Sequence, residues 1–271
     1  MFLPRTGALC AVALSLLAGC ASTPETLSLE RIAAIVASPD RAPADRINDI
    51  RRKPEEMLAF IGVRPGSVAI DVSAARGYTI ELVARAVGPT GKVYGQNAPR
   101  DTTRAPPAQP EGAAAPPTAG VSATPAAPTL AERASKPATA NIVPVSRSFE
   151  DPAPPEVASN ALDLVTLMFN YHDLGHLGVD RAQMNRAIFS ALKPGGVYVI
   201  ADHSGRAGTG ISESGTLHRV EEAFVVQEVQ AAGFRLVAGG DFMRNPADPR
   251  DRNTPEPPMP KDEFVLKFAK P

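Results

Sequence analysis

The chain has 271 residues, which is enough for one large domain or two small ones. Its 28 Lys and Arg balance 29 Asp and Glu, so its charge argues against nucleic acid or another polyanion as a partner. Aromatic residues make up 5% of the chain and tryptophan is absent, which weighs against stacking surfaces for bases or sugars.

The first twenty residues have the pattern of a secretory signal peptide. Arg5 gives a short positive region, and residues 8–17 form an apolar run that is too short to span a bilayer as a helix. Residues 17–20 (LAGC) resemble the lipobox of bacterial lipoproteins, in which the cysteine, here Cys20, receives the lipid. An ordinary signal peptide with a chance cysteine is the alternative.

The use of cysteine agrees with this prediction, because Cys10 and Cys20 are the only two in the chain. A mature chain that begins at Cys20 has none left for a disulfide, a thiol nucleophile or a cysteine-bound metal. By the same resemblance, Ala21 in place of aspartate favours the outer membrane. We expect an exported protein that faces the periplasm and contacts the membrane through its lipid anchor alone, with residues 21–28 as a tether.

After the tether, the pattern alternates between helices and short apolar strands. Apolar residues at helical spacing predict helices at 29–36, 45–53, 54–60 and 78–87. Residues 68–72 form a nearly continuous apolar run, as in a strand that is covered on both faces of a parallel sheet, and residues 92–95 begin a second strand. The two strands and the helix between them form a unit that is right-handed and parallel by default.

Residues 98–129 are dominated by proline, alanine and threonine. Such a composition cannot bury enough apolar surface to offset the entropy lost on ordering, so we expect a disordered insertion within one domain. A boundary between two domains is the alternative, but the segment from Leu29 to Tyr94 is too short to form a core of its own.

The second half of the chain continues the alternation. Predicted helices cover 130–136, 182–192 and 217–232, and predicted strands cover 142–145, 161–169, 197–201, 234–238 and 263–268, with a turn at 193–196. This order predicts a doubly wound α/β sheet in a single domain that extends over residues 29–271.

The order of these landmarks resembles the class I S-adenosylmethionine-dependent methyltransferases. Residues 192–199 (LKPGGVYV) are similar to the segment before the fifth strand of that family, 231–234 (AAGF) to its next helix-to-strand corner, and 63–66 (VRPG) to the entry to its first strand. The resemblance extends to exported proteobacterial proteins described as predicted methyltransferases, which share the segments 171–173 and 202–203. It implies a Rossmann-like, seven-stranded and mostly parallel sheet.

The resemblance also implies a site for S-adenosylmethionine at the loop after the first strand. In the family this loop runs acidic-x-Gly-x-Gly-x-Gly, because larger side chains would collide with the cofactor. Here Asp71 and Gly77 match, whereas Ser73 and Ala75 stand at the first two glycine positions. Gln96 stands near the end of the second strand, where the family holds the ribose hydroxyls with a carboxylate.

The chain contains four histidines: His172, His176, His203 and His218. The predicted strands place His172 and His176 after one strand and His203 after the next, with His218 at the start of the following helix. Because the carboxyl ends of parallel strands meet at one edge of a sheet, at least three histidines should converge there, together with Asp173 and Asp202.

Histidine with carboxylate is the composition of a general acid–base pair or of a metal site. No spacing here matches a known metal-ligand motif, so we predict catalysis or substrate binding and assign no metal. The alternative is that these are loop residues that cap helices and satisfy backbone groups.

The sequence therefore predicts methyl transfer from S-adenosylmethionine to an unknown small-molecule or protein acceptor, with His172, Asp173 or His203 as the general base. The alternative is a non-catalytic envelope lipoprotein that uses the fold as a binding module, because S-adenosylmethionine is not expected to be plentiful outside the cytoplasm. A groove with Arg76 turned away favours the enzyme, and a groove filled by Arg76 favours the module. A metal-dependent hydrolase is a third alternative.

Overall fold

The computed structural model describes residues 25–99, 126–255 and 257–271. The predicted signal peptide (1–20) with its lipidation site Cys20, and residues 100–125 of the predicted insertion, lie outside the described residues. Within the described ranges, no helix is both long enough and apolar enough to cross a bilayer.

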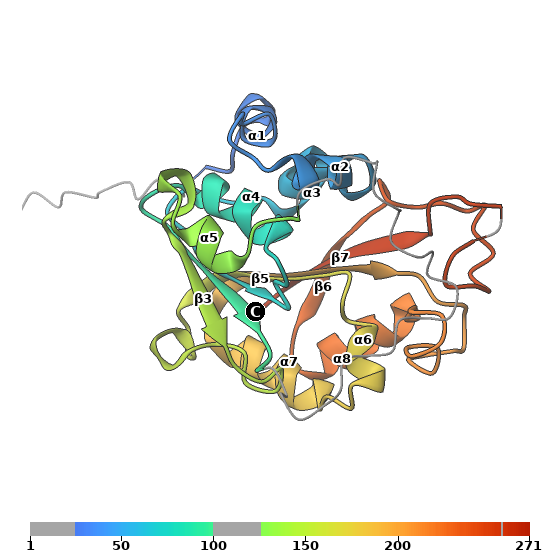
Figure 1. The fold of residues 1–271 in the computed structure, drawn as a ribbon. Helices are drawn as coiled ribbons and strands as arrows, with labels where there is room; N and C mark the ends of the chain where they lie inside the picture. Colours follow the sequence, from blue (N-terminus) through green and yellow to red (C-terminus); the bar gives the residue numbers. More distant parts are fainter. Residues whose placement is uncertain (1–24, 100–125, 256) are drawn as a thin grey trace, which may run out of the picture.

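A seven-stranded sheet forms the centre of the molecule (Figure 1). Its strands are β1 (Val68–Val72), β2 (Lys92–Asn97), β3 (Ile142–Ser146), β4 (Leu162–Met168), β5 (Leu192–His203), β6 (Arg235–Gly240) and β7 (Glu263–Ala269). Their order is β3-β2-β1-β4-β5-β7-β6, and β7 is antiparallel to both of its neighbours while the other pairs are parallel. The predicted fold class, a doubly wound and mostly parallel α/β sheet, is confirmed.

Helices cover both faces of this sheet (Figure 1). They are α1 (Leu29–Val36), α2 (Pro43–Arg52), α3 (Pro54–Ile61), α4 (Tyr78–Val87), α5 (Leu130–Ala134), α6 (Asp173–His176), α7 (Arg181–Ala191) and α8 (Glu222–Ala231). One core contains side chains of α1, α3 and α4, and the other contains side chains of α7 and α8. Along β5, Val199 and Ala201 join the first core whereas Tyr198 and Ile200 join the second, as the alternation of a strand requires.

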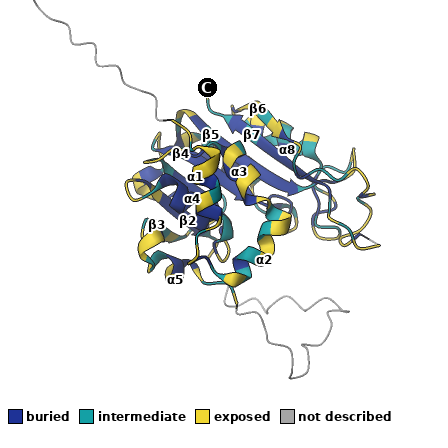
Figure 2. Cartoon of the chain, turned by 90° about the horizontal axis from the view of Figure 1, so that it is seen from above, coloured by how far each residue is buried: buried dark blue, intermediate teal, exposed yellow. Residues whose placement is uncertain are grey.

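Burial follows the same layers (Figure 2). The central strands are buried beneath the helices, whereas α2 is exposed along much of its length.

Two predicted boundaries are wrong. The helix predicted to begin at Leu217 begins at Glu222, because His218 has a left-handed backbone with φ of 50° and Val220 forms a parallel bridge with Ser204. Residues 217–221 therefore lie beside the end of β5. The turn predicted at 193–196 belongs to an irregular start of β5, where the pairing with β4 shifts its register.

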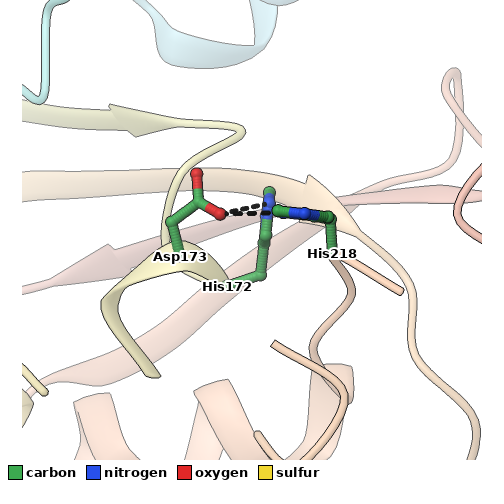
Figure 3. A group of neighbouring side chains, drawn as sticks. All are labelled: His172, Asp173 and His218. Carbon is green, nitrogen blue, oxygen red and sulfur yellow. Dashed lines mark hydrogen bonds and ion pairs between the residues drawn. The ribbon is translucent and has the colours of Figure 1, made fainter. Parts of the chain in front are cut away.

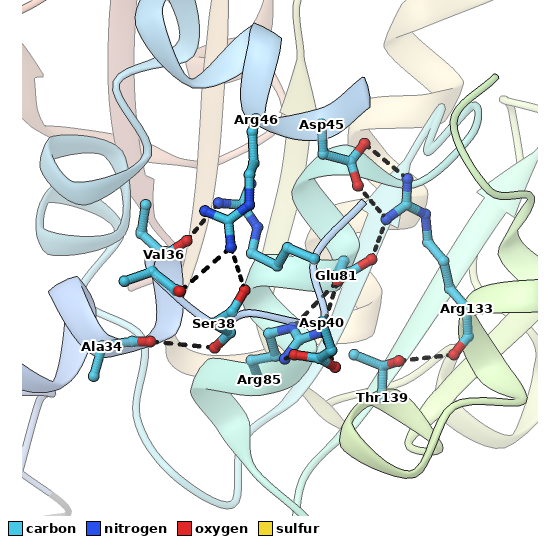
Figure 4. A network of polar contacts seen from close by, with 12 residues as sticks. Ala34, Val36, Ser38, Asp40, Asp45, Arg46, Glu81, Arg85, Arg133 and Thr139 are labelled. Carbon is cyan, nitrogen blue, oxygen red and sulfur yellow. Dashed lines mark hydrogen bonds and ion pairs between the residues drawn. The ribbon is translucent and has the colours of Figure 1, made fainter. Parts of the chain in front are cut away.

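A buried guanidinium joins helices from both sides of residues 100–125 (Figure 4). Arg133 of α5 is fully buried and donates to the two carboxylate oxygens of Asp45 in α2, at 2.7 and 2.9 Å. It also donates to Glu81 in α4, and its Nε donates to the carbonyl oxygen of Arg76 at 2.6 Å. One side chain thus ties α2, α4 and α5 to the loop that follows β1.

Replacing Arg133 with methionine keeps an unbranched apolar stem but removes the guanidinium, which leaves the buried carboxylate of Asp45 unpaired. Removing one partner of a buried ion pair costs about 3–5 kcal/mol. We expect Arg133→Met to lower the free energy of unfolding by an amount in this range, measured by urea denaturation. The matched control is Arg186→Met on the exposed face of α7, which should change it by less than about 0.5 kcal/mol. Equal effects of the two substitutions would contradict the role of Arg133.

Candidate functional site

The candidate residues follow the carboxyl ends of three neighbouring parallel strands. Residues 73–77 follow β1, residues 169–173 follow β4, and His203 ends β5. The strand order reverses between β1 and β4, and ligands of open α/β sheets bind at such a switch point.

The loop after β1 has a left-handed backbone at the three positions where the class I methyltransferase pattern has glycine. The φ angle is 58° at Ser73, 49° at Ala75 and 92° at Gly77. For a residue with a Cβ this conformation costs about 1–2 kcal/mol. Ser73 and Ala75 therefore hold a turn that glycine would adopt without strain.

Gly77 is required by a close approach of α5. A Cβ at Gly77 would lie 2.7 Å from Cδ2 of Leu130 and 2.9 Å from Cδ and Nε of Arg133. Both neighbours come from the protein, so the packing of α5 on the loop is sufficient to explain glycine at this position.

Gln96 and Asn97, at the end of β2, fix the loop. Gln96 is fully buried, its Oε1 accepts a hydrogen bond from the N–H of Ser73 at 2.9 Å, and its Nε2 donates to the carbonyl oxygen of Arg147 at 2.7 Å. Asn97 accepts from the N–H of Ala75 at 2.8 Å and donates to its carbonyl oxygen at 3.1 Å. In place of the predicted contact with a ribose, the structure gives Gln96 a role in holding the loop.

Asp71 is buried at the end of β1. Its side chain accepts a hydrogen bond from Oγ1 of Thr166 at 2.6 Å. Burial disfavours the carboxylate and raises the pKa of Asp71 to about 7, against the opposing effects of this hydrogen bond and of the charge of Arg52.

A pocket of about 260 Å³ lies beside the loop, at the switch point. Its wall includes residues 73–77, Asp71 at the end of β1, Met168 at the end of β4, and Arg52 at the end of α2. Arg76 is exposed, and its Nε donates to the carbonyl oxygen of Ala127 at 2.5 Å. Arg76 and Ala127 both line the pocket, so this hydrogen bond forms part of its wall.

Arg52 brings a positive charge without a counter-ion to this pocket. Its guanidinium lies 4.1 Å from the ring centre of Phe169 and 5.7 Å from that of Tyr78. Its buried Nε has no hydrogen-bond partner, and among the described residues the side chain forms no ion pair. Burial lowers the pKa of Arg52 to about 10, so the side chain stays charged at neutral pH. Such a group favours a ligand with an anionic end.

The four histidines lie in one cluster, as expected from their positions after neighbouring strands. The ring centre of His172 is 5.3 Å from that of His203 and 5.6 Å from that of His218. His176 lies 5.7 Å from His218. Asp202 fixes His172, because its Oδ1 lies 2.6 Å from the ring Nδ1 and its Oδ2 accepts the backbone N–H of His172 at 2.7 Å.

Asp173 lies between two imidazoles (Figure 3). Its Oδ1 is 3.1 Å from Nε2 of His172 and 3.1 Å from Nδ1 of His218. Burial would raise the pKa of Asp173, but the hydrogen bonds and charges of the two histidines outweigh it and lower the pKa to about 2. Burial likewise disfavours the charged ring of His172, but the charge of Asp202 and the hydrogen bonds with Asp173 and Asp202 raise its pKa to about 9.

His203 has the opposite protonation state to His172. Burial lowers the pKa of His203 to about 3 despite the charge of Asp202, so its ring is neutral at neutral pH. Its Nδ1 lies 2.9 Å from Oε1 of Glu263 but outside hydrogen-bond geometry, and Arg51 donates to the same oxygen at 2.8 Å. The cluster therefore places a neutral imidazole beside the charged ring of His172.

A chain of hydrogen bonds links the loop to the histidines. Oγ of Ser73 donates to Oδ1 of Asn170 at 2.5 Å, and Nδ2 of Asn170 donates to Oδ2 of Asp173 at 2.9 Å. Asp173 in turn contacts His172 and His218. The pocket and the histidine cluster thus lie side by side along the carboxyl edge of the sheet.

Arg52 and Asn170 are residues of this region that sequence reasoning missed. Arg52 lies in a charged helix without a motif, and only the tertiary fold brings it to the loop. Asn170 could have been found, because it stands between a buried strand and the segment 171–173. His218 belongs to the cluster, but it lies on the segment before α8 and not at the start of a helix.

Comparison with known proteins identifies the fold. No family model matches this chain, and no curated protein matches it. A SAM-dependent methyltransferase from Aquifex aeolicus is 17% identical with a TM-score of 0.52, over 89% of this chain and 98% of its own. An arsenic(III) S-adenosylmethionine methyltransferase from Chlamydomonas reinhardtii is 16% identical with a TM-score of 0.50, over 88% and 72%.

The similar structures also include a protein named for another activity. The [4+2]-cyclase SpnF is 15% identical with a TM-score of 0.50, over 90% of this chain and 92% of its own. This chain is therefore similar in fold to class I methyltransferases, and its activity has to be argued from its site.

The raised pKa of Asp71 has a consequence for stability. Between about pH 4 and pH 7, the folded protein retains a proton at Asp71 that the unfolded chain releases, because the pKa rises from 3.8 to about 7 on folding. The contribution of Asp71 to stability is therefore fully present below pH 3.8 and is lost as the pH rises through 7.

Asp71→Asn removes the titration and keeps an acceptor for Thr166. We expect this variant to melt at a higher temperature than the wild-type protein near pH 8, and to gain little near pH 4, in thermal denaturation followed by circular dichroism. The exposed Asp241→Asn is the matched control and should show no such dependence on pH. The same change in melting temperature for Asp71→Asn at both pH values would contradict the raised pKa.

Proposed function

We propose that this protein is an S-adenosylmethionine-dependent methyltransferase that acts on a small-molecule or protein acceptor. The observation that carries the proposal is the pocket at the switch point, where Arg52 and the loop after β1 form one wall. The fold similarity to SAM-dependent methyltransferases supports it. A ligand with a carboxylate at one end suits the unpaired guanidinium of Arg52.

The residues fit the amino-acid end of this cofactor. A carboxylate there would pair with the guanidinium of Arg52, which lines the pocket and forms no ion pair among the described residues. The left-handed turn at Ser73 and Ala75 keeps the loop close to the pocket with small side chains only. At the end of β2, Gln96 is fully buried and bonds the loop and Arg147, so it presents no acceptor to a ribose in the pocket.

In the proposed reaction, the bound cofactor supplies an electrophilic methyl group. Methyl transfer is an in-line displacement, so most of the acceleration comes from the positioning of the acceptor. His172, Asp173 and His203 lie beside the pocket along the same edge and are linked to it through Asn170. The neutral ring of His203 can receive the proton of an acceptor that carries one, whereas Asp173 and the charged ring of His172 orient the acceptor.

A binding module without catalysis is the second candidate. This candidate is favoured by the hydrogen bonds of the loop. The N–H groups of Ser73 and Ala75, which could otherwise bind a ligand, donate to the side chains of Gln96 and Asn97. In this candidate the pocket holds a small anionic ligand that is not converted. Export and anchoring at Cys20, which we propose from residues 1–20, fit this role because the module needs no methyl donor in the envelope.

Calorimetric titration of S-adenosylhomocysteine and S-adenosylmethionine into the purified protein tests the proposal. We expect saturable one-to-one binding at micromolar strength, about −8 kcal/mol. Arg52→Met should weaken the binding by about 10- to 100-fold, because it removes the charge that a carboxylate would bind.

The matched control is Arg186→Met, since Arg186 lies on the exposed face of α7 and does not line the pocket. Its affinity should stay near that of the wild-type protein. If the folded wild-type protein shows no heat of binding up to millimolar ligand, the methyltransferase proposal is contradicted and the binding module is favoured. Equal losses in both variants would remove the role given to Arg52.

A further inference from the structure

One carboxylate oxygen faces two imidazole nitrogens that come from separate segments (Figure 3). Asp173 begins α6, His172 precedes it, and His218 lies on the segment between β5 and α8. The Oδ1 of Asp173 is 3.1 Å from each of the two nitrogens. One ligand atom from each of the three residues can be chosen so that all lie within 4.8 Å of one another.

These separations are those of ligands around one metal ion. Zinc bonds to histidine nitrogen and carboxylate oxygen are about 2.0–2.2 Å long, which in a tetrahedron sets neighbouring ligand atoms about 3.3–3.5 Å apart. The observed nitrogen-to-oxygen distances are within a few tenths of an ångström of this value. Small rotations of the side chains would admit an ion among the three atoms.

Hydrogen bonds from residues outside the three, called outer contacts below, already orient two of the three side chains. His172 directs its Nδ1 to the buried carboxylate of Asp202 at 2.6 Å, which leaves Nε2 for the cluster. Asp173 directs Oδ2 to the amide of Asn170 at 2.9 Å, which leaves Oδ1. A carboxylate behind a histidine ligand, and a hydrogen bond to the second oxygen of a carboxylate ligand, are the usual outer contacts of metal sites.

We propose that His172, Asp173 and His218 form a binding site for a divalent first-row transition-metal ion, with Zn²⁺ as the best-fitting occupant. The ligand atoms are Nε2, Oδ1 and Nδ1, respectively. Two imidazoles with one carboxylate suit zinc and its neighbours in the series, whereas Mg²⁺ and Ca²⁺ take sets of oxygen ligands. The site does not depend on the proposed cofactor, because none of the three residues lines the pocket beside the loop.

The site is accessible from solvent on one side. The side chains of His218 and His176 are 39% and 36% exposed, whereas that of His172 is 5% exposed. Nδ1 of His176 lies 3.9 Å from the same oxygen of Asp173 and contacts Oγ of Ser214 at 3.0 Å. An ion can enter from this side, and the remaining coordination position is open to water, to a substrate or to His176 after a rotation.

Metal binding to tag-free protein, after treatment with a chelator, tests the proposal. We expect calorimetry to show one Zn²⁺ ion per chain and the Co²⁺ complex to show the visible absorption bands of low-coordinate cobalt. Mg²⁺ at the same concentration should not displace either ion. A wild-type protein that binds no Zn²⁺, or that binds Mg²⁺ equally well, would overturn the proposal.

Substitutions assign the ligands. His218→Asn removes an imidazole from a half-exposed position and suits its φ of 50°, since asparagine tolerates a left-handed backbone. We expect His218→Asn and Asp173→Asn to lose more than the roughly 10- to 100-fold in zinc affinity that is typical of an outer-contact substitution. His203→Gln is the matched control, because this neighbouring imidazole is not among the proposed ligands, and its zinc affinity should be nearly unchanged.

Thermal denaturation of each variant shows whether it is folded. If Asp173→Asn fails to fold, the exposed His218→Asn alone decides the outcome. Zinc affinity that is unchanged in folded His218→Asn would overturn the assignment. The result is distinct from that of the cofactor titration, because the metal is added alone.

Discussion

The ion pair between Arg133 and Asp45 is the buried polar contact that joins α2 to α5, and together with the contacts of Asp49 to Arg41 and Tyr78 it places α2 beside the candidate pocket. Along α2 only Asp45 is buried, so apolar packing does little to fix this helix on the domain. Arg133 also bonds the carbonyl oxygen of Arg76, so one side chain positions both α2 and the loop after β1. At the end of α2, Arg52 then lies over Phe169 and reaches the pocket. Because a buried ion pair adds little net stability compared with apolar packing, we infer that it serves orientation.

The carboxyl edge of the sheet also holds unusual backbone. Ser73, Ala75, Phe169 and His218 have φ angles of 58°, 49°, 60° and 50°, although none is glycine. Each costs about 1–2 kcal/mol and persists only where the surrounding contacts enforce it. At Ser73 and Ala75 those contacts are the side-chain amides of the last two residues of β2. Strain gathered at one edge, beside a pocket and a histidine cluster, is typical of a functional site.

The sequence predicted the fold and the gathering of the histidines, because both follow from local patterns. Apolar runs such as 68–72 mark buried strands, and parallel strands bring the residues after them to one edge. The start of α8 was predicted wrongly because Val220 has the spacing of a helical stripe but is buried by its bridge to Ser204. Arg52 and the engagement of Gln96 depend on contacts between distant segments, which no spacing shows.

The proposed metal ligands show the same limit of sequence reasoning. His172 and Asp173 are adjacent, but the third ligand, His218, comes from a different segment, so the set has no spacing that a motif could contain. The three ligands meet only in the fold, where the loop after β5 returns along the sheet edge. There the N–H of Gly205 donates to the carbonyl oxygen of Val220, and the N–H of Val220 donates to that of His203.

If the pocket and the histidine edge act as one site, a crystal structure with S-adenosylhomocysteine will show it. We expect the ligand to occupy the pocket beside residues 73–77, with its carboxylate at Arg52 and its sulfur directed toward Asp173. A ligand bound elsewhere, or a pocket that stays empty at saturating concentration, would show that the two regions do not form one site.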